Sequence, residues 1–496
     1  MTSETAMNFP LLSLLLWLPL GGVLLCLIFR KSVESCRLLA LATNLLVLAI
    51  GLGIAFTADA GSGGWLIYED YSWIEQFGIH YTLGMDGLSL LLVLLTAFLQ
   101  VIAVLISWRI DYHPVFFFSL ILMLGTAFIG VFLALDLILF YLFWELMLIP
   151  MFALIGIWGL ERRVYAAVKF FLFTLSGSLL MLLAMIGLYL LHGEQTGVYT
   201  FALESLKQTE LSLTQELIFY LCFMAAFAVK VPLFPFHAWL PDAHQQAPGA
   251  GSVDLAGLLL KTGVYGIIRF AFPLFPRAAE MSLPVLAILA LFGLFYAAAV
   301  AYQQPDIKRL VAYSSVSHLG FVVLGLAAWN QTAWEGSMLL MINHGVTSAA
   351  MFVMLALVRQ RTGSNEISKL GGLWQSQPNL SAFFLLFSFA SLGLPGLANF
   401  AGEILILVGT FASKPLWASI AVVGVLMAAI YMLRLVQSVI WGPCCEPFEK
   451  QDLVTREWLV LIPLALLVIW LGCYPQPLLD PIREPVTLLL QQGGLP

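Results

Sequence analysis

A lysine interrupts an apolar run in the middle of the chain, at a depth where a membrane helix ordinarily carries no charge. This residue, Lys230, is followed at once by Pro232 and Pro235 and then by His237. Proline lacks a backbone donor and clashes with the carbonyl four residues earlier, so the helix must break here. Inside a bilayer a break is tolerated only where it is buried in protein or borders water. The combination predicts a path for protons or other cations.

Further ionisable side chains stand inside apolar runs elsewhere. Glu145 lies within LILFYLFWELMLIP, Lys261 within LAGLLLKTGVYG, and Glu403 follows Pro395 in a second interrupted run. Burial away from water favours the neutral forms of carboxylates and amines, whereas mutual pairing favours their charged forms. A contact between Glu145 and Lys230 that opens and closes would therefore release and hold a proton.

Histidines lie between these charges and could hand a proton from one to the next. Imidazole takes up and releases protons near neutral pH, so we expect His237, His318 and His344 to act as a set. A single histidine inside a membrane protein is about as often a packed hydrogen-bonding group as a proton relay. For Arg434 two roles stay open, namely reaching the membrane surface or positioning Glu403.

Three other polar residues are expected to have structural roles. Asp136 follows an apolar run and is interpreted as a solvated cap at the edge of its helix. Asp242 and His244 are expected to shape the polar turn that follows the first break.

The composition fixes the class of protein. Of its 496 residues, 61% are hydrophobic and only 10% are charged, with a mean hydropathy of +0.97. This balance is typical of a polytopic membrane protein. The net charge of −6 forms no acidic or basic block, so nucleic acid is not an expected partner. The six scattered cysteines and the lack of glycine-rich nucleotide loops predict no metal and no cofactor-binding site in this chain.

Runs of roughly 20 apolar residues, the length that crosses a bilayer, predict an all-α fold with about 14 transmembrane helices. The expected spans are 9–29, 38–57, 84–108, 114–133, 135–158, 164–191, 216–247 (broken), 252–272, 283–302, 306–328, 335–357, 379–412 (broken), 416–440 and 457–473. They divide into N-terminal transmembrane helices (1–113), two five-helix units (114–272 and 283–440) and a C-terminal transmembrane helix with a tail (441–496).

The two five-helix units are interpreted as inverted repeats, each with one broken helix. Three pairs of ionisable residues share an offset of 173 positions: Glu145 and His318, Lys230 and Glu403, Lys261 and Arg434. An odd number of spans per unit turns the second unit upside down relative to the first, as in many transporters. With the N-terminus outside, 15 of the 22 basic residues fall on the inner side, as the positive-inside rule requires.

Several motifs resemble those of one family of membrane subunits. The runs are LFWELMLIPMFALIGIWG, AAVKFFLFT, AVKVPLFPFHAWLPDAHQQAPGAGSVDLAGLLLKTG, DIKRLVAYSSVSHLGFV and GLPGLANFAGEILIL. They closely resemble the subunit M (chain 4) family of NADH-quinone oxidoreductase, the antiporter-like subunits of respiratory complex I. The resemblance covers most of the chain, residues 80–480. Glu403 favours the M type, because L-type chains usually carry lysine at that position.

The resemblance implies a role for five residues. They match the family's glutamate of the fifth helix, the lysines of the seventh and eighth, the histidine of the tenth and the glutamate of the twelfth: Glu145, Lys230, Lys261, His318 and Glu403. In that family these side chains form a central hydrophilic axis. Quinone reduction in neighbouring subunits drives protons through it.

The resemblance also implies partners and a location. It implies a non-redox, proton-pumping subunit of a translocating enzyme in the bacterial cytoplasmic (inner) membrane, surrounded by lipid. The expected partners are L-type and N-type antiporter-like subunits and small K-, A-, J- and H-type subunits. FMN, iron–sulfur clusters and quinone would be bound by partner subunits. Three alternatives stay open: an Mrp-type Na⁺/H⁺ antiporter subunit, a proton-pumping subunit of a membrane-bound hydrogenase, and a non-transporting scaffold.

Overall fold

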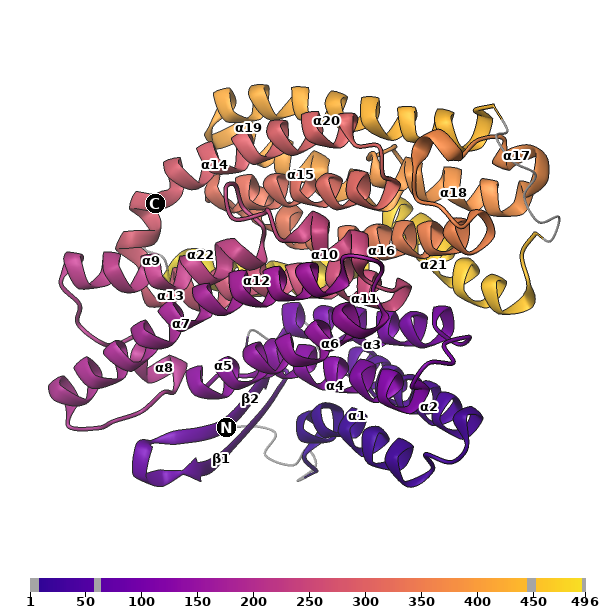
Figure 1. The fold of residues 1–496 in the computed structure, drawn as a ribbon. Helices are drawn as coiled ribbons and strands as arrows, with labels where there is room; N and C mark the ends of the chain where they lie inside the picture. Colours follow the sequence, from indigo (N-terminus) through magenta and orange to yellow (C-terminus); the bar gives the residue numbers. More distant parts are fainter. Residues whose placement is uncertain (1–8, 58–63, 444–451, 493–496) are drawn as a thin grey trace.

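The computed structural model describes residues 9–57, 64–443 and 452–492. Helices make up most of this part and lie along one common direction (Figure 1). Thirteen helices in the described ranges are long and apolar enough to cross a bilayer. Two shorter apolar helices, Pro378–Ser391 and Ala398–Ser413, together supply one further, interrupted span. The multi-pass helical architecture predicted from the sequence is therefore confirmed.

The N-terminal part contributes three spans and a short hairpin. Its elements are α1 (Leu11–Ile28), α2 (Val33–Thr57), β1 (Ile67–Ile74), η1 (Glu75–Phe77), β2 (Ile79–Met85) and α3 (Gly87–Ile106). In Figure 1, α1 and α2 form the indigo layer at the bottom of the bundle.

The first five-span unit follows. Its elements are α4 (Pro114–Leu133), α5 (Leu137–Leu146), α6 (Leu148–Trp158), α7 (Arg163–Thr196), α8 (Leu203–Leu206), α9 (Leu213–Lys230), α10 (Leu240–Gln246), α11 (Gly249–Asp254), η2 (Leu255–Leu259), α12 (Leu260–Gly266), η3 (Ile267–Ala271) and α13 (Phe272–Leu274).

The second five-span unit and the C-terminal part complete the chain. Their elements are α14 (Pro276–Gln303), α15 (Ile307–Ala327), α16 (Gln331–Thr362), η4 (Ile367–Lys369), α17 (Leu373–Ser376), α18 (Pro378–Ser391), α19 (Ala398–Ser413), α20 (Pro415–Val436), η5 (Gln437–Trp441), α21 (Thr455–Cys473) and α22 (Gln476–Gln492).

The hairpin was not expected, because hydropathy alone marked residues 58–83 only as a long connection. Within the described part of that stretch, β1 and β2 pair as antiparallel strands. The Glu69 carboxylate on β1 accepts hydrogen bonds from the N–H groups of Leu12 (2.7 Å) and Ser13 (3.1 Å). The first N–H groups of a helix lack internal acceptors. Glu69 therefore caps α1 and fixes the hairpin to the bundle.

The two ends of the bundle differ in composition. One end carries the hairpin, α8 and α22. Residues of α8, of α22 and of the segments that flank the hairpin line a common cavity there; we refer to this end as the hairpin face. The helices alternate in direction, so the opposite end collects basic side chains: Arg30, Lys31, Arg162, Lys308 and Arg359. We refer to this end as the basic face.

The first helix break follows Lys230, where α9 ends, and the chain turns until α10 begins at Leu240. Pro232 and Pro235 lie inside the turn. The buried Trp239 indole donates a hydrogen bond to the carbonyl of Val229 (2.9 Å). Carbonyls at a helix end need outside partners, so Trp239 stabilises the interruption.

The second break lies between α18 and α19 and is held by α16. Gly393 and Gly396 have φ values of 79° and 89°, a region that side chains other than glycine rarely adopt. Asn343 on α16 donates to the carbonyl of Ala398 (2.6 Å), the first residue of α19. Thr347, one turn further along α16, donates to Asn399 (2.9 Å).

Asp136 is a cap as expected, but it is buried rather than solvated. Its carboxylate accepts from the N–H groups of Ile138 (2.9 Å) and Leu139 (3.1 Å) at the start of α5, and from His80 N–H of β2 (3.2 Å). The side chain has no exposed surface. Burial raises the pKa of Asp136 to about 6. One carboxylate thus joins α5 to the hairpin.

Replacing Asp136 with alanine should lower the thermal midpoint of the assembled protein. Three N–H groups would lose their acceptor, one of them in a buried hydrogen bond. Loss of an N-cap costs about 1 kcal/mol, and an unsatisfied buried donor costs about 1–3 kcal/mol. The control is Asp111→Ala, which removes an exposed partner of Arg37 and should change stability by at most about 1 kcal/mol. Equal melting of the two variants would contradict the role of Asp136.

Candidate functional site

Four of the predicted residues form one connected chain in the middle of the bundle. The Lys261 ammonium on α12 lies 2.9 Å from Nδ1 of His344 on α16. The rings of His344 and His318 are 5.5 Å apart between centroids. Nδ1 of His318 on α15 lies 3.1 Å from the Glu403 carboxylate on α19. A lysine of the first unit is thus linked through two imidazoles to a glutamate of the second.

All four of these side chains are withdrawn from the surface of the protein. Lys261 is fully buried, and His344, His318 and Glu403 expose at most 4% of their surface. Burying an ionisable group is costly unless it is paired and hydrogen-bonded. Along a row of such groups, a proton can pass from one side chain to the next while no charge faces lipid.

The helix that carries Lys261 is irregular on both sides of it. The segments η2 and η3 are π-helical turns before and after α12, a feature found frequently at functional sites. The Lys261 ammonium donates to the carbonyl of Ala256, which lies in η2. The irregular turn therefore supplies an acceptor to the buried lysine in addition to His344.

Glycines bring neighbouring backbones close to the two buried lysines. A Cβ on Gly263 would lie 2.9 Å from the Lys230 Cβ, so α12 and the end of α9 are in direct contact. A Cβ on Gly257 would lie 2.4 Å from the Leu99 side chain and 3.4 Å from the Gly345 carbonyl. Small residues allow such close helix packing in membranes.

Lys230 and Glu145 are not in contact in this structure. Lys230 is fully buried, and neither its Nζ nor Oε1 of Glu145 has a hydrogen-bond partner within the described residues. The ammonium lies 4.9 Å from the ring centroid of Trp144, the residue next to Glu145. Cation–π attraction partly offsets the cost of burying such a charge. The expected contact between these two side chains is therefore not formed in this structure.

His237 lies apart from the row of four, toward the basic face. Its ring is stacked near Phe234 (5.7 Å) and packs edge-on against Tyr296 (5.2 Å) and Tyr313 (6.2 Å). Only 5% of the residue is exposed. The structure therefore gives His237 an aromatic pocket next to the break rather than a place between Lys261 and Glu403.

Asp242 does more than shape its turn. Its carboxylate on α10 pairs with Lys169 of α7 (2.6 Å) and with Arg309 of α15 (2.6 Å). One side chain of the broken element thus connects both five-span units at the basic face.

Glu403 fits closely against the second break. A Cβ on Gly393 would lie 2.3 Å from the Glu403 carboxylate, so glycine is needed there for space as well as for its φ. Pro395 follows within the same turn. Arg434, for which positioning Glu403 was one possibility, instead lies 4.6 Å from the ring centroid of Tyr302.

Other buried polar groups lie near this row. The ion pair between Arg269 and Asp86 was not predicted from the sequence. Asp254 is fully buried and accepts a hydrogen bond from Gln100 (3.0 Å). His244 is also fully buried, stacked on an aromatic ring. The MDGLS run, with a carboxylate directly before an apolar helix, was the available signal for Asp86.

No metal-binding arrangement is found in this part of the chain. Among the described residues, no group of three or more His, Cys, Asp or Glu side chains is placed to hold a metal ion. The chemistry that the site can perform is the movement of protons between amines, imidazoles and carboxylates.

Comparison with known proteins places this geometry in a family. A family model described as NADH:quinone oxidoreductase/Mrp antiporter, TM matches residues 134–428. The NADH-quinone oxidoreductase subunit M of Pseudomonas aeruginosa is 45% identical over 482 residues, which cover 94% of each chain. The subunit M of Escherichia coli K12 is 43% identical over 487 residues, covering 94% of this chain and 96% of its own.

Solved structures agree with the sequence relatives. A chain of respiratory complex I from Thermus thermophilus with bound NADH matches with a TM-score of 0.87 and 32% identity, covering 96% of this chain and 99% of its own. A chain of the Mrp complex from Dietzia matches with a TM-score of 0.83 and 21% identity, covering 97% of this chain and 55% of its own, which shows a shared fold. The chain therefore belongs to the NADH:quinone oxidoreductase/Mrp antiporter family of membrane proteins.

Proposed function

We propose that this chain is a proton-translocating membrane-arm subunit of a complex I-type NADH:quinone oxidoreductase. The observation that carries the proposal is the unbroken row of contacts from Lys261 through His344 and His318 to Glu403. The near full-length similarity to subunits M supports the choice of parent complex. The chain itself performs no redox step.

Protons are taken up at the basic face, beside the first helix break. His237 lies there next to the turn that begins at Lys230. The ion pairs of Asp242 with Lys169 and Arg309 hold the broken element against its neighbours. An unwound segment at membrane depth is where a transporter binds its ion.

The contact between Glu145 and Lys230 controls the first transfer. When the carboxylate moves close to the ammonium, the charged lysine is stabilised and keeps its proton. When the two separate, as in this structure, the buried lysine binds its proton more weakly. The proton then passes to Lys261, whose helix packs against α9 at Gly263.

The imidazoles carry the proton across to the second unit. Lys261 hands its proton to Nδ1 of His344, which releases one from its other ring nitrogen toward His318. Nε2 of His318 has no partner among the described side chains and backbone groups, so it is free to accept. His318 then releases a proton from Nδ1 to Glu403.

Electrons move in partner subunits. FMN, iron–sulfur clusters and quinone belong to those subunits, and NADH is the donor that the relatives' names support. Antiporter-like L-type and N-type subunits and small K-, A-, J- and H-type subunits are the proposed neighbours in the membrane. The exposed apolar side chains on α1, α2 and α7 fit contacts with lipid or with such subunits.

The proposed location is a bacterial cytoplasmic membrane, with the N-terminus outside. The basic side chains gathered at one end of the bundle support this orientation, because such residues are enriched on the cytoplasmic side. The hairpin face would then be the outer face.

Lys230→Ala or Glu145→Ala should uncouple pumping while the complex still assembles. Loss of a positioned proton carrier slows transfer by roughly 100-fold or more. The measurement is NADH-driven acidification of inverted membrane vesicles, compared with electron transfer and with assembly on native gels. Lys369→Ala removes a surface lysine and should pump like the wild type. Wild-type pumping in both Lys230→Ala and Glu145→Ala would rule out the pair mechanism.

Glu403→Gln should impair pumping, whereas Glu403→Asp should keep part of it. Glutamine cannot take up the proton that His318 offers, but aspartate can, at a longer distance. The same vesicle assay gives protons moved per electron for the two variants side by side. A glutamine variant that pumps as well as the aspartate variant would show that Glu403 is not a proton acceptor.

A further inference from the structure

A second buried polar cluster lies on the same helix as Lys261, toward the hairpin face. Arg269 on η3 forms an ion pair with Asp86, the residue that precedes α3. Both side chains are at least 90% buried. Asp86 also caps α3 by accepting a hydrogen bond from Ser89 N–H (2.9 Å). The row of four described above does not include this cluster.

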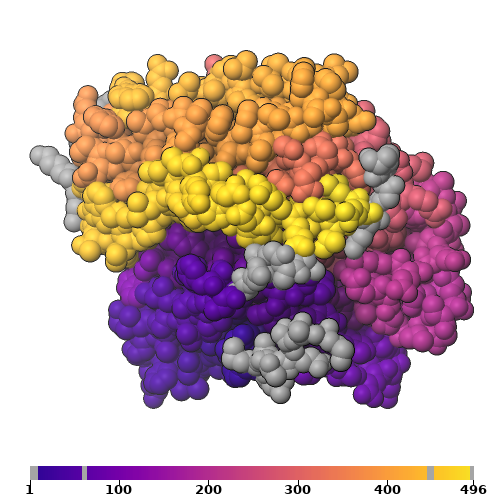
Figure 2. Space-filling model, turned by 180° about the vertical axis from the view of Figure 1, so that it is seen from behind, coloured from indigo at the N-terminus to yellow at the C-terminus, as the bar shows by residue number. Residues whose placement is uncertain are grey.

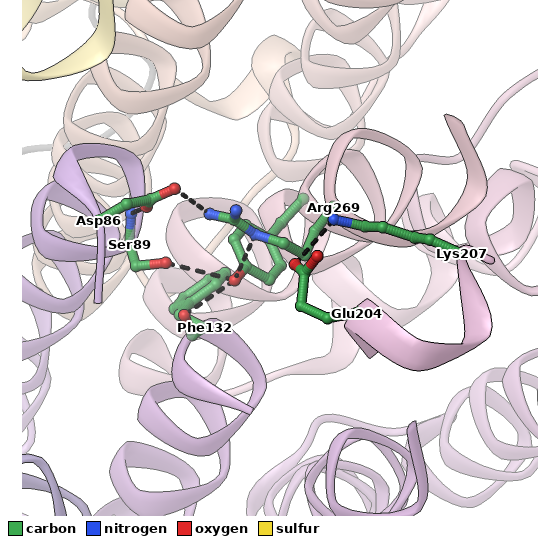
Figure 3. Close-up of polar contacts among 7 residues, drawn as sticks. Asp86, Ser89, Phe132, Glu204, Lys207 and Arg269 are labelled. Atoms are coloured by element: carbon green, nitrogen blue, oxygen red, sulfur yellow. Dashed lines mark hydrogen bonds and ion pairs between the residues drawn. The ribbon is translucent and has the colours of Figure 1, made fainter. Parts of the chain in front are cut away.

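Tyr265 connects the members of this cluster. Its hydroxyl donates to the carbonyl of Phe132 (2.9 Å), accepts from Nε of Arg269 (3.2 Å) and lies 3.2 Å from the Ser89 hydroxyl. Figure 3 shows these polar contacts converging beside the Asp86–Arg269 pair. Tyr265 and Ser89 are fully buried.

A cavity adjoins the cluster on the side of the hairpin face. The cavity, of about 140 Å³, is lined by Asp86, Arg269 and Trp65 and, nearer the surface, by Glu204 and Lys207. Glu204 and Lys207 pair at 2.8 Å, and the Glu204 side chain is 65% exposed. The charged side chains in its lining and this volume suit several waters. The ion pair thus lies between this cavity and the interior of the bundle.

The cluster lies in line with the buried lysine. Lys261, Tyr265 and Arg269 follow one another at intervals of four residues, and residues four apart share one side of a helix. One turn of helix is about 5.4 Å long, a distance that one water bridging two hydrogen bonds can span. The lysine reaches toward His344 in this structure, and rotation of its four side-chain bonds can turn it toward Tyr265.

We propose that Tyr265 and the Asp86–Arg269 ion pair form a proton outlet from Lys261 to the hairpin face, with the ion pair as its gate. The outlet rests on the proposed function, because it needs a proton on Lys261. It gives the chain a release route within its first unit, separate from Glu403.

The cluster takes up one proton from Lys261 and releases one proton to the cavity. The Lys261 ammonium gives a proton through water to the Tyr265 oxygen, and Tyr265 passes its own hydroxyl proton to Ser89. Ser89 in turn passes its hydroxyl proton to the Asp86 carboxylate. Asp86 then releases a proton to water in the cavity. Tyr265, Ser89 and Asp86 regain their starting charges, and Lys261 stays neutral until it takes up the next proton.

Arg269 supplies the gate. A protonated Asp86 no longer attracts the guanidinium, which keeps its contacts with the rings of Trp65 (5.1 Å) and Tyr265 (5.4 Å). A fixed positive charge at the outer end also repels protons arriving from outside, as cationic side chains do in channels. When Asp86 loses its proton, the ion pair forms again and closes the outlet.

The decisive variant is Tyr265→Phe in the complete complex in membrane vesicles. It removes only the hydroxyl, and loss of a positioned proton carrier slows transfer by roughly 100-fold. We expect fewer protons pumped per electron at unchanged electron transfer and assembly. The matched control is Tyr220→Phe, which removes a buried hydroxyl bonded to Ser282 (2.5 Å) outside the cluster. It should pump like the wild type.

Thiol labelling tests the gate independently. In a Ser89→Cys variant, a membrane-impermeant methanethiosulfonate applied from the hairpin face should react faster during turnover than at rest. Adding Asp86→Asn, which keeps a capping side chain but removes the charge, should make the resting rate as high as the turnover rate. The parent chain without the added cysteine gives the background.

Two results would overturn the outlet. One is a proton-to-electron ratio in Tyr265→Phe equal to that of Tyr220→Phe. The other is Ser89→Cys labelling that is the same at rest and during turnover. If Lys230→Ala still abolished pumping, the proposed function would stand and only the outlet would fail. If Lys230→Ala also pumped normally, the function itself would fail.

Discussion

The structure depends on a lysine buried without a carboxylate. Within the described part of the chain, the Lys261 ammonium is bonded to a backbone carbonyl and to the ring of His344, and no ion pair with a carboxylate includes it. A buried charge with only neutral partners is held at a high free energy. Its proton is therefore easily shared with an imidazole. The π-helical turns that free the Ala256 carbonyl and the glycines that admit neighbouring helices serve this one contact.

Each of the two helix breaks makes room for a buried ionisable side chain, and the two do so in different ways. At the first, Lys230 occupies the last turn of α9, and its ammonium lies over the Trp144 ring. At the second, Glu403 lies in the first turns of α19 and rests against Gly393. Where a helix is interrupted, the side chains and backbone hydrogen bonds of a regular turn are missing. The space that results admits an ionisable group. Both interruptions are stabilised by side chains from other segments, Trp239 and Asn343.

Much of the site could be predicted because charge in an apolar run is a local signal. Lys230, Lys261 and Glu403 stand out from their neighbours, and prolines mark the breaks. The contacts between these side chains depend on packing between distant segments, and a local sequence pattern cannot predict such contacts. Asp86 and Arg269 are an example, because 183 positions separate them in the chain. The hairpin was missed for another reason, since its two strands are short and mix polar with apolar residues, which a search for long apolar runs does not detect.

In Figure 2 the yellow C-terminal helices form a band between the indigo N-terminal part and the orange second unit, and α22 is one of these helices. It packs against α3 of the N-terminal part and α16 of the second unit, and the carbonyl of Pro481 would lie 2.0 Å from a Cβ on Gly87. Such a strap limits how far the halves can rock apart. This packing therefore disfavours alternating access by rigid rotation of one half against the other, and it favours transport by side-chain rotation and shifts of water.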